Sequence, residues 1–241
     1  MAIRDEDIMK IISETFSTVK GDETPKSQLL KEVAYVLQPK SYSIESDTLS
    51  SKSLNANIAD FENTVKVANE ISAKLDSVDR SNANYKDSEF RELKTAEATN
   101  LADAFLTSLH FDNIADPVSQ ITMDSLSFMR LSRDFGTFED WQKDFIACAM
   151  SARNGFAVTV YNGFLNRYMN LMVDDSSLGL LYNCYPVICL SVKESAYFRD
   201  YLDDRKSYIF AQMKEFKWPL IEKRIKKADK LAKLLSQPLG D

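Results

Sequence analysis

Residues 136–170 read GTFEDWQKDFIACAMSARNGFAVTVYNGFLNRYMN, and this stretch decides the fold that we predict. Thr137 is a residue type that caps helices, and two acidic residues follow it in the first turn, where backbone N–H groups lack partners. Apolar side chains then recur at steps of three and four, which places them on one face of a helix. This face consists of Trp141, Phe145, Cys148, Ala149 and Ala152.

The second half of the stretch changes direction twice. Asn154-Gly155 is a helix stop, since both residue types tolerate the left-handed backbone of a C-cap. Residues 156–161 are β-branched and aromatic, and we predict an extended segment there. Asn162-Gly163 turns the chain again, and residues 164–172 predict a further helix. Arg153 and Arg167 therefore flank a folded corner, although a plain helix–turn–helix corner with both arginines paired to carboxylates fits equally well.

The composition indicates a helical protein. Of the 241 residues 44% are apolar and 27% charged, as in ordinary soluble domains, while six glycines and six prolines are few for this length. With apolar spacings mostly of three and four, this predicts an all-α fold. No apolar run approaches the roughly 20 residues of a membrane span, and no N-terminal hydrophobic region of a leader occurs, which predicts a cytosolic protein without a membrane span.

The expected organisation is an arm followed by a core. Residues 4–19 form an amphipathic pattern, residues 27–37 a short helix, and residues 40–56 a serine-rich segment too polar to order itself. We predict an N-terminal helical arm and linker over residues 1–56. The core domain, residues 57–241, is predicted to be a multi-helix bundle with a flexible N-terminal arm attached.

Within the core, helices are predicted at 57–78, 89–109, 118–135 and 191–216. The apolar segment 178–190 contains Pro186, and we interpret it as a buried irregular crossing or a helix broken at Tyr185. The final helix after Pro219 is basic and amphipathic. Such a helix binds RNA phosphates, binds an anionic membrane surface, or is simply a solvated face.

No catalytic signature is present. The sequence lacks a glycine-rich phosphate loop, a nucleophile elbow and a pair of cysteines at metal spacing. Cys148, Cys184 and Cys189 are an odd set that we interpret as reduced, buried thiols, and His110, the single histidine, as a half-buried packing residue. We therefore predict no enzyme, no catalytic residues, no metal site and no cofactor.

The corner resembles coat proteins of flexible filamentous plant viruses of the trichovirus and capillovirus type. Those proteins have a Thr-Phe start, an aromatic residue seven positions later, an Ala-Arg or Arg-Asn helix end, and a Tyr with a nearby Gly. The corresponding residues here are Thr137-Phe138, Phe145, the segment 152–155, and Tyr161 with Gly163. Two departures are Glu139-Asp140, where the family has Arg-Gln, and the segment 181–183, which lacks the family's acidic residue.

The resemblance implies a coat protein or nucleoprotein that encapsidates single-stranded RNA by helical self-assembly into a filament. It implies contacts between copies through the N-terminal arm, and a location in the virion or host cytoplasm. RNA would lie in an inner groove, with stacking on a tyrosine. The implied RNA-binding residues are Arg153, Asn154, Tyr161, Arg167, Arg130 and Arg133. The competing hypothesis is a cytosolic all-helical interaction or scaffold protein that does not bind nucleic acid.

Overall fold

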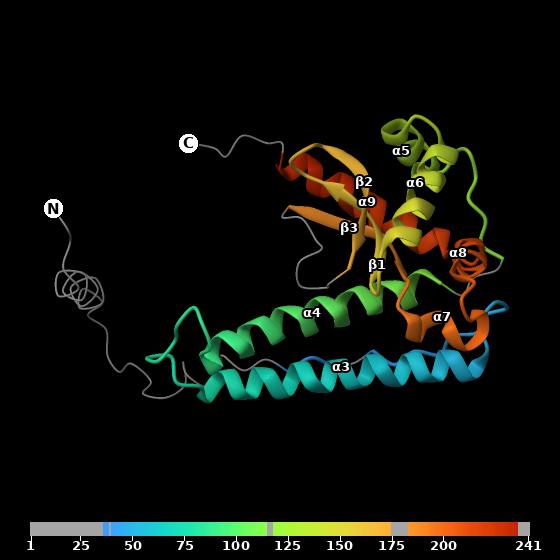
Figure 1. The fold of residues 1–241 in the computed structure, drawn as a ribbon. Helices are drawn as coiled ribbons and strands as arrows, with labels where there is room; N and C mark the ends of the chain where they lie inside the picture. Colours follow the sequence, from blue (N-terminus) through green and yellow to red (C-terminus); the bar gives the residue numbers. More distant parts are fainter. Residues whose placement is uncertain (1–35, 39, 115–117, 175–182, 236–241) are drawn as a thin grey trace, which may run out of the picture.

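The computed structural model describes residues 36–38, 40–114, 118–174 and 183–235, which form a helical hairpin joined to a small α/β unit (Figure 1). The helices predicted within residues 4–37 fall almost wholly outside this part of the chain. The hairpin pairs α3 (Ser51–Ser77) with α4 (Glu89–Asn113). Ser50 and Ser88 cap the two helices by accepting hydrogen bonds from backbone N–H groups of the first turn.

The hairpin has its own small apolar core. Phe61 and Val65 of α3 pack against Ala104 and Phe111 of α4, and Ile114 closes the cluster. The chain before α3 lies along this hairpin, where the Asn69 side chain bonds both backbone groups of Leu37. The segment expected to be a linker is described from residue 40, and α3 begins inside it at Ser51. The division into arm and core at residue 56 stays a prediction.

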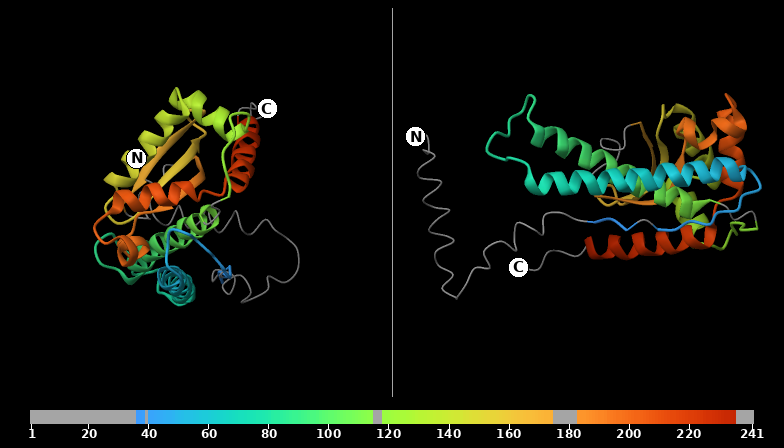
Figure 2. Two further views of the ribbon diagram at one scale, coloured as in Figure 1. Left: turned by 90° about the vertical axis from the view of Figure 1, so that its right-hand side faces the viewer. Right: turned by 90° about the horizontal axis from the view of Figure 1, so that it is seen from below.

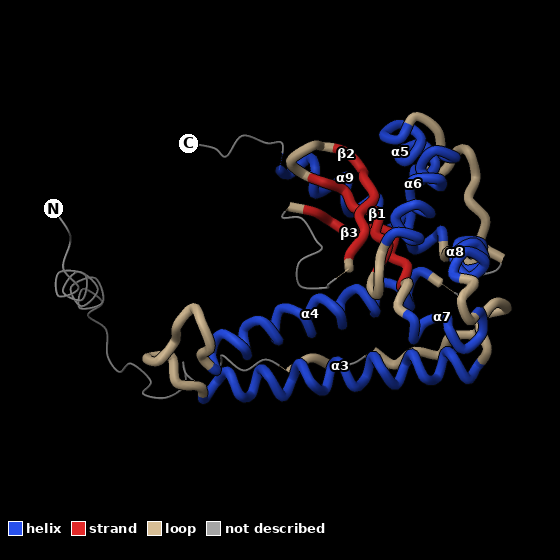
Figure 3. The backbone as a smooth tube through the Cα atoms, in the orientation of Figure 1, coloured by secondary structure: helices blue, strands red, loops and turns tan. Residues whose placement is uncertain are grey.

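The α/β unit contains three antiparallel strands in the order β2-β1-β3 (Figure 3). The strands are β1 (Phe156–Asn162), β2 (Arg167–Val173) and β3 (Cys184–Ser191), and the helices are α5 (Leu126–Phe135), α6 (Phe138–Ser151), α7 (Glu194–Tyr201), α8 (Arg205–Lys214) and α9 (Trp218–Leu235). The predicted all-α fold is therefore wrong. Residues 164–172 form a turn and strand β2, and the predicted irregular crossing contains strand β3.

Side chains of β1 alternate between two apolar layers, because successive residues of a strand point to opposite faces. Phe156, Val158 and Val160 face α4, where they meet Leu106. Ala157 and Tyr161 face the main core, which α6, α8 and α9 complete. In the left view of Figure 2 the hairpin lies below the sheet, and α6 and α9 lie beside the sheet.

Two details confirm the sequence-based prediction for α6. Thr137 caps the helix by accepting from Asp140 N at 3.0 Å, and Trp141 and Phe145 are fully buried. The Trp141 indole donates to Thr159 Oγ1 at 3.0 Å, so its polar edge is satisfied inside the core. None of the helices in the described residues is long and apolar enough to span a membrane.

Candidate functional site

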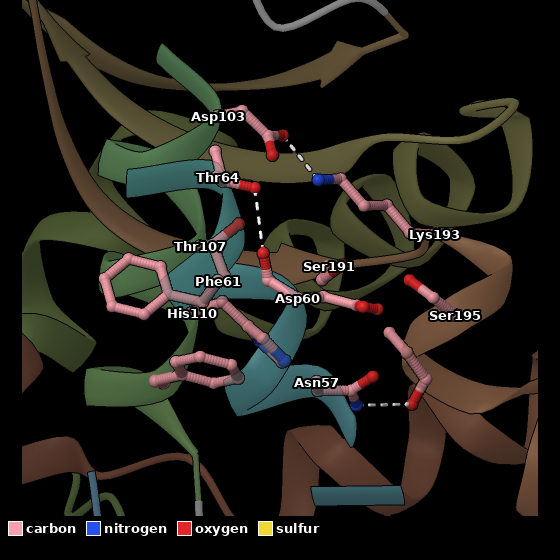
Figure 4. A pocket seen from close by; sticks show the side chains of 12 residues that line it. Asn57, Asp60, Phe61, Thr64, Asp103, Thr107, His110, Ser191, Lys193 and Ser195 are labelled. Atoms are coloured by element: carbon pink, nitrogen blue, oxygen red, sulfur yellow. Dashed lines mark hydrogen bonds and ion pairs between the residues drawn. The ribbon is translucent and has the colours of Figure 1, made fainter. Parts of the chain in front are cut away.

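A polar cavity of about 40 Å³ lies where the hairpin meets the α/β unit (Figure 4). Helix α3 lines one side, α4 a second, and the link from β3 to α7 the third. Nine of the lining side chains are polar or charged, in a part of the molecule otherwise packed with apolar residues. They are Asn57, Asp60, Thr64, Asp103, Thr107, His110, Ser191, Lys193 and Ser195.

Helical spacing brings these side chains to one place. On α3, Asn57, Asp60 and Thr64 are separated by three and four residues, so they lie along one face. The same spacing places Asp103, Thr107 and His110 along one face of α4. Lys193 is the N-cap residue of α7 and makes no capping hydrogen bond with its side chain, which extends into the pocket instead.

The pocket contains an ion pair between the hairpin and the α/β unit. The Lys193 ammonium pairs with the Asp103 carboxylate, and both side chains are largely shielded, with 24% and 18% of their surface exposed. The same ammonium lies 4.9 Å from the centre of the Phe156 ring, a favourable cation–π arrangement. The positive charge in the pocket is thus supplied and neutralised by the chain itself.

His110 is fully buried and uncharged. Burial first and the nearby Lys193 charge second lower the pKa of its imidazole to about 3, and a hydrogen bond with the Cys189 backbone opposes them. Its Nδ1 atom has no hydrogen-bond partner among the described residues. Because Nδ1 is unpaired, Nε2 is the nitrogen that donates to the Cys189 carbonyl, and Nδ1 is a bare acceptor.

Asn57 makes a second link between the two parts. Its Nδ2 donates to the Ala196 backbone carbonyl at 3.3 Å, which joins α3 to α7. Its Oδ1 is buried and has no partner in the described part of the chain. The pocket therefore holds two orphaned acceptors, one on each helix of the hairpin, beside a neutralised ion pair.

The three cysteines are not reactive thiolates. Burial raises the pKa of Cys148 to about 11, and it also raises the pKa of Cys184 and Cys189. A thiol with a raised pKa stays protonated at neutral pH, so it is a poor nucleophile and a poor metal ligand. All three are free thiols, but the prediction that they are buried holds only for Cys189, since Cys148 and Cys184 are partly exposed.

The six residues predicted to bind RNA lie in two separate places. Arg153 and Asn154 precede β1, where Asn154 Oδ1 accepts from Glu194 N at 3.1 Å. The other four lie near the opposite end of β1. Arg130 pairs with Asp229, Arg133 and Arg167 both bond Asp134, and the Tyr161 hydroxyl lies 3.3 Å from Asn166 Oδ1.

These positions do not form the single furrow that the prediction required. Arg130 and Arg133 pair with carboxylates, whereas the Arg167 guanidinium donates to the Asp134 backbone carbonyl. The alternative, a corner with Arg153 and Arg167 both paired to carboxylates, is therefore not the arrangement found either. Whether any of the six residues contacts a ligand stays a prediction.

Sequence reasoning missed the pocket because its residues are scattered over 139 positions. A signal was nevertheless present on the hairpin. Asn57 interrupts the apolar stripe of α3 between Leu54 and Phe61, and His110 lies between Leu106 and Phe111 on α4. A polar residue within a buried helical face either forms hydrogen bonds with another element or belongs to a site. Asn57 and His110 were therefore the two positions in the sequence that could have indicated the pocket.

Comparison of the sequence with known proteins identifies the family of the chain. The sequence model of the family "Iron/manganese superoxide dismutases, C-terminal domain" matches residues 126–224. The iron superoxide dismutase of Aquifex aeolicus is 30% identical over 175 residues, which cover 71% of this chain and 81% of that protein. The chain belongs to the iron/manganese superoxide dismutase family.

A second relative matches mainly the α/β unit. Manganese superoxide dismutase 1 of Halobacterium salinarum is 35% identical over 99 residues, or 41% of this chain. That match spans about half of the relative, 49% of its length.

The family assignment corrects several predictions. The resemblance to viral coat proteins is wrong, and so are RNA encapsidation, helical self-assembly through the arm, and a location in the virion. The alternative of an all-helical scaffold is also contradicted. The prediction that the protein is not an enzyme is contradicted as well, since its relatives are oxidoreductases. The match had rested on a few short motifs around residues 137–163.

The family name implies iron or manganese, and the pocket residues do not fit either ion. Imidazole nitrogens and carboxylate oxygens are suitable donors for these metals. The chain has one histidine in total, and in the described residues no three His, Cys, Asp or Glu side chains form a metal-binding group. The Asp103 carboxylate is engaged by Lys193, whose ammonium repels a metal cation from the same cavity.

Replacing Lys193 with methionine tests the ion pair. The change leaves the shielded Asp103 charge without this partner, and we expect a loss of about 1–2 kcal/mol in the free energy of unfolding. The pKa of His110 should rise, because the Lys193 charge lowers it. Urea denaturation and NMR titration measure the two effects. Lys206→Met on the exposed surface of α8 is the matched control, expected to change neither quantity; equal effects in both variants would contradict the assignment.

Proposed function

We propose that this chain retains the superoxide dismutase fold with a metal-free pocket. In this proposal the pocket is a polar junction that holds the hairpin against the α/β unit. Superoxide is not dismutated there by a bound iron or manganese ion. The observation that carries the proposal is the Lys193–Asp103 ion pair inside the pocket.

Electrostatics supports this proposal. Two like unit charges about 4 Å apart repel by about 4 kcal/mol at an effective dielectric constant of about 20, and a divalent ion doubles this value. An ion in this cavity would also have to compete with Lys193 for Asp103. Asp60, on the α3 side, is the second carboxylate that lines the cavity, and the remaining donors, chiefly the hydroxyls of Thr107, Ser191 and Ser195, are neutral.

Contacts between the elements support the junction role. Asn57 links α3 to α7, His110 links α4 to β3, and Lys193 links the β3–α7 segment to α4. Each contact joins residues separated by more than 75 positions. A junction of this kind stabilises the relative placement of the two parts without a bound ion.

The second candidate function is superoxide dismutation with iron or manganese. The sequence relationship favours it, because the relatives named above are superoxide dismutases and one matches across 71% of this chain. It requires a donor set that the described residues lack. The two candidates therefore differ in a directly measurable quantity, the metal content of the purified protein.

Metal analysis and a dismutase assay on the full chain separate the candidates. The chain is produced in medium supplemented with iron and with manganese, beside the Aquifex aeolicus relative prepared identically. We expect no stoichiometric iron or manganese after gel filtration and no dismutation above that of the heat-denatured chain. One bound iron or manganese ion per chain, together with dismutation, would overturn the proposal in favour of the second candidate.

A further inference from the structure

We propose that the pocket binds one water molecule, which donates hydrogen bonds to His110 Nδ1 and Asn57 Oδ1. This inference rests on the proposed function, since a metal ion on His110 would use the same nitrogen. It assigns the pocket a ligand of defined chemistry, a small neutral hydrogen-bond donor.

The two acceptors identify the chemistry of the ligand. Neither His110 Nδ1 nor Asn57 Oδ1 has a partner in the described residues, although the residues are only 2% and 8% exposed. More than nine in ten buried polar groups are hydrogen-bonded, so two unpaired acceptors in one cavity indicate a donor that the chain does not supply. Both side chains line the same cavity, and Figure 4 shows the His110 ring beside Asn57. One molecule with two donor hydrogens satisfies both.

The cavity has room for a water molecule. A buried water requires about 10–15 Å³ of space open to a water-sized sphere, and the cavity provides about 40 Å³ of such space. A buried water needs two to four polar partners. Besides the two acceptors, the hydroxyls of Thr107 and Ser191 line the pocket and are suitable donors to the water oxygen.

The charges around His110 favour a neutral ligand. Lys193, from the β3–α7 link, is paired with Asp103 on α4, and Asp60 lines the α3 side. An anion would meet the bare acceptors and two carboxylates, whereas an additional cation would meet the Lys193 ammonium. Burial keeps His110 neutral, so Nδ1 accepts and cannot donate. The hydrogens must come from the ligand.

The single histidine allows a direct test by NMR. In the uniformly ¹⁵N-labelled full chain, a long-range ¹H–¹⁵N spectrum contains one imidazole, that of His110. We expect the tautomer protonated at Nε2, an Nδ1 resonance displaced toward that of a hydrogen-bonded acceptor, and a cross-peak between the ring protons and a slowly exchanging water. Asn57→Leu removes one acceptor and should abolish the water cross-peak. Asn55→Leu, at an exposed position two residues away, should preserve it.

Different outcomes test the water and the metal-free pocket separately. If metal-free protein shows an unperturbed Nδ1 resonance and no water cross-peak, the proposal of a bound water is overturned. The proposed function is then unaffected. A His110 signal that moves when a chelator removes iron or manganese places a metal on Nδ1, and both proposals fail. Should Asn57→Leu not fold, the wild-type spectrum alone decides.

Discussion

Replacing Gly155 with alanine is expected to lower the free energy of unfolding by at least about 3 kcal/mol, at the upper end of what overpacking costs. Gly155 is buried where the chain passes from α6 into β1. A Cβ atom there would lie 1.7 Å from the Val173 carbonyl oxygen and 2.8 Å from its carbon. Both are backbone atoms at the end of β2, so no side-chain rotation relieves the overlap.

The backbone of Gly155 cannot move away freely, since its carbonyl accepts a hydrogen bond from Val192 N at 2.8 Å. Urea or thermal denaturation of the purified variant measures the effect. Gly163→Ala is the matched control, because the three atoms nearest to the new Cβ all belong to the Asn183 side chain, which can rotate. We expect a markedly smaller loss there. Equal stability of Gly155→Ala and the wild type would show that the two backbones are not packed this closely.

Lowering the pH from 6.5 to 5 is expected to lower the free energy of unfolding by about 2 kcal/mol through His110 alone. The imidazole has an ordinary pKa near 6.5 in the unfolded chain and about 3 in the folded protein. Between these values the unfolded chain binds a proton that the folded protein does not. Stability therefore falls as pH falls, by up to about 1.4 kcal/mol per pH unit.

Urea denaturation at several pH values, with the wild type and His110→Leu, isolates this effect. The variant lacks the only histidine, so its stability should change less across this window. Carboxylates with a lowered pKa, such as Glu222, lose their contribution at lower pH and do so in both proteins. Parallel pH dependences in the two proteins would contradict a buried, neutral His110.

Rules that act within a single helix predicted α6 correctly, but they did not predict the strands that pack against it. The Thr137 cap and the apolar face with Trp141 and Phe145 follow from rules within one helix. Gly155 was predicted as a left-handed helix stop, but α6 ends at Ser151, and its C-cap residue Ala152 has an ordinary φ of −63°. The glycine is needed because β2 passes within contact distance, a tertiary requirement that no local pattern contains.

The sheet was missed for similar reasons. Strand β2 has seven residues and mixed burial, so its apolar positions do not alternate cleanly. Strand β3 contains Pro186, which favoured a broken helix. In the structure this proline lies on an edge strand, next to a register shift between Thr159 and Val160, where proline is tolerated. The pocket could not be predicted at all, since its chemistry depends on three separate elements meeting.

The separation of these elements along the chain also determines when the pocket can form. The Asn57–Ala196 contact spans 139 residues, and closing so long a loop makes it a late, non-local step in folding. During synthesis at about 5–20 residues per second, the hairpin precedes α7 by several seconds or more. Its own cluster around Phe61 and Phe111 can assemble in that interval. Asn57 and His110 meanwhile remain hydrated, and they are withdrawn from bulk solvent only when the β3–α7 segment docks.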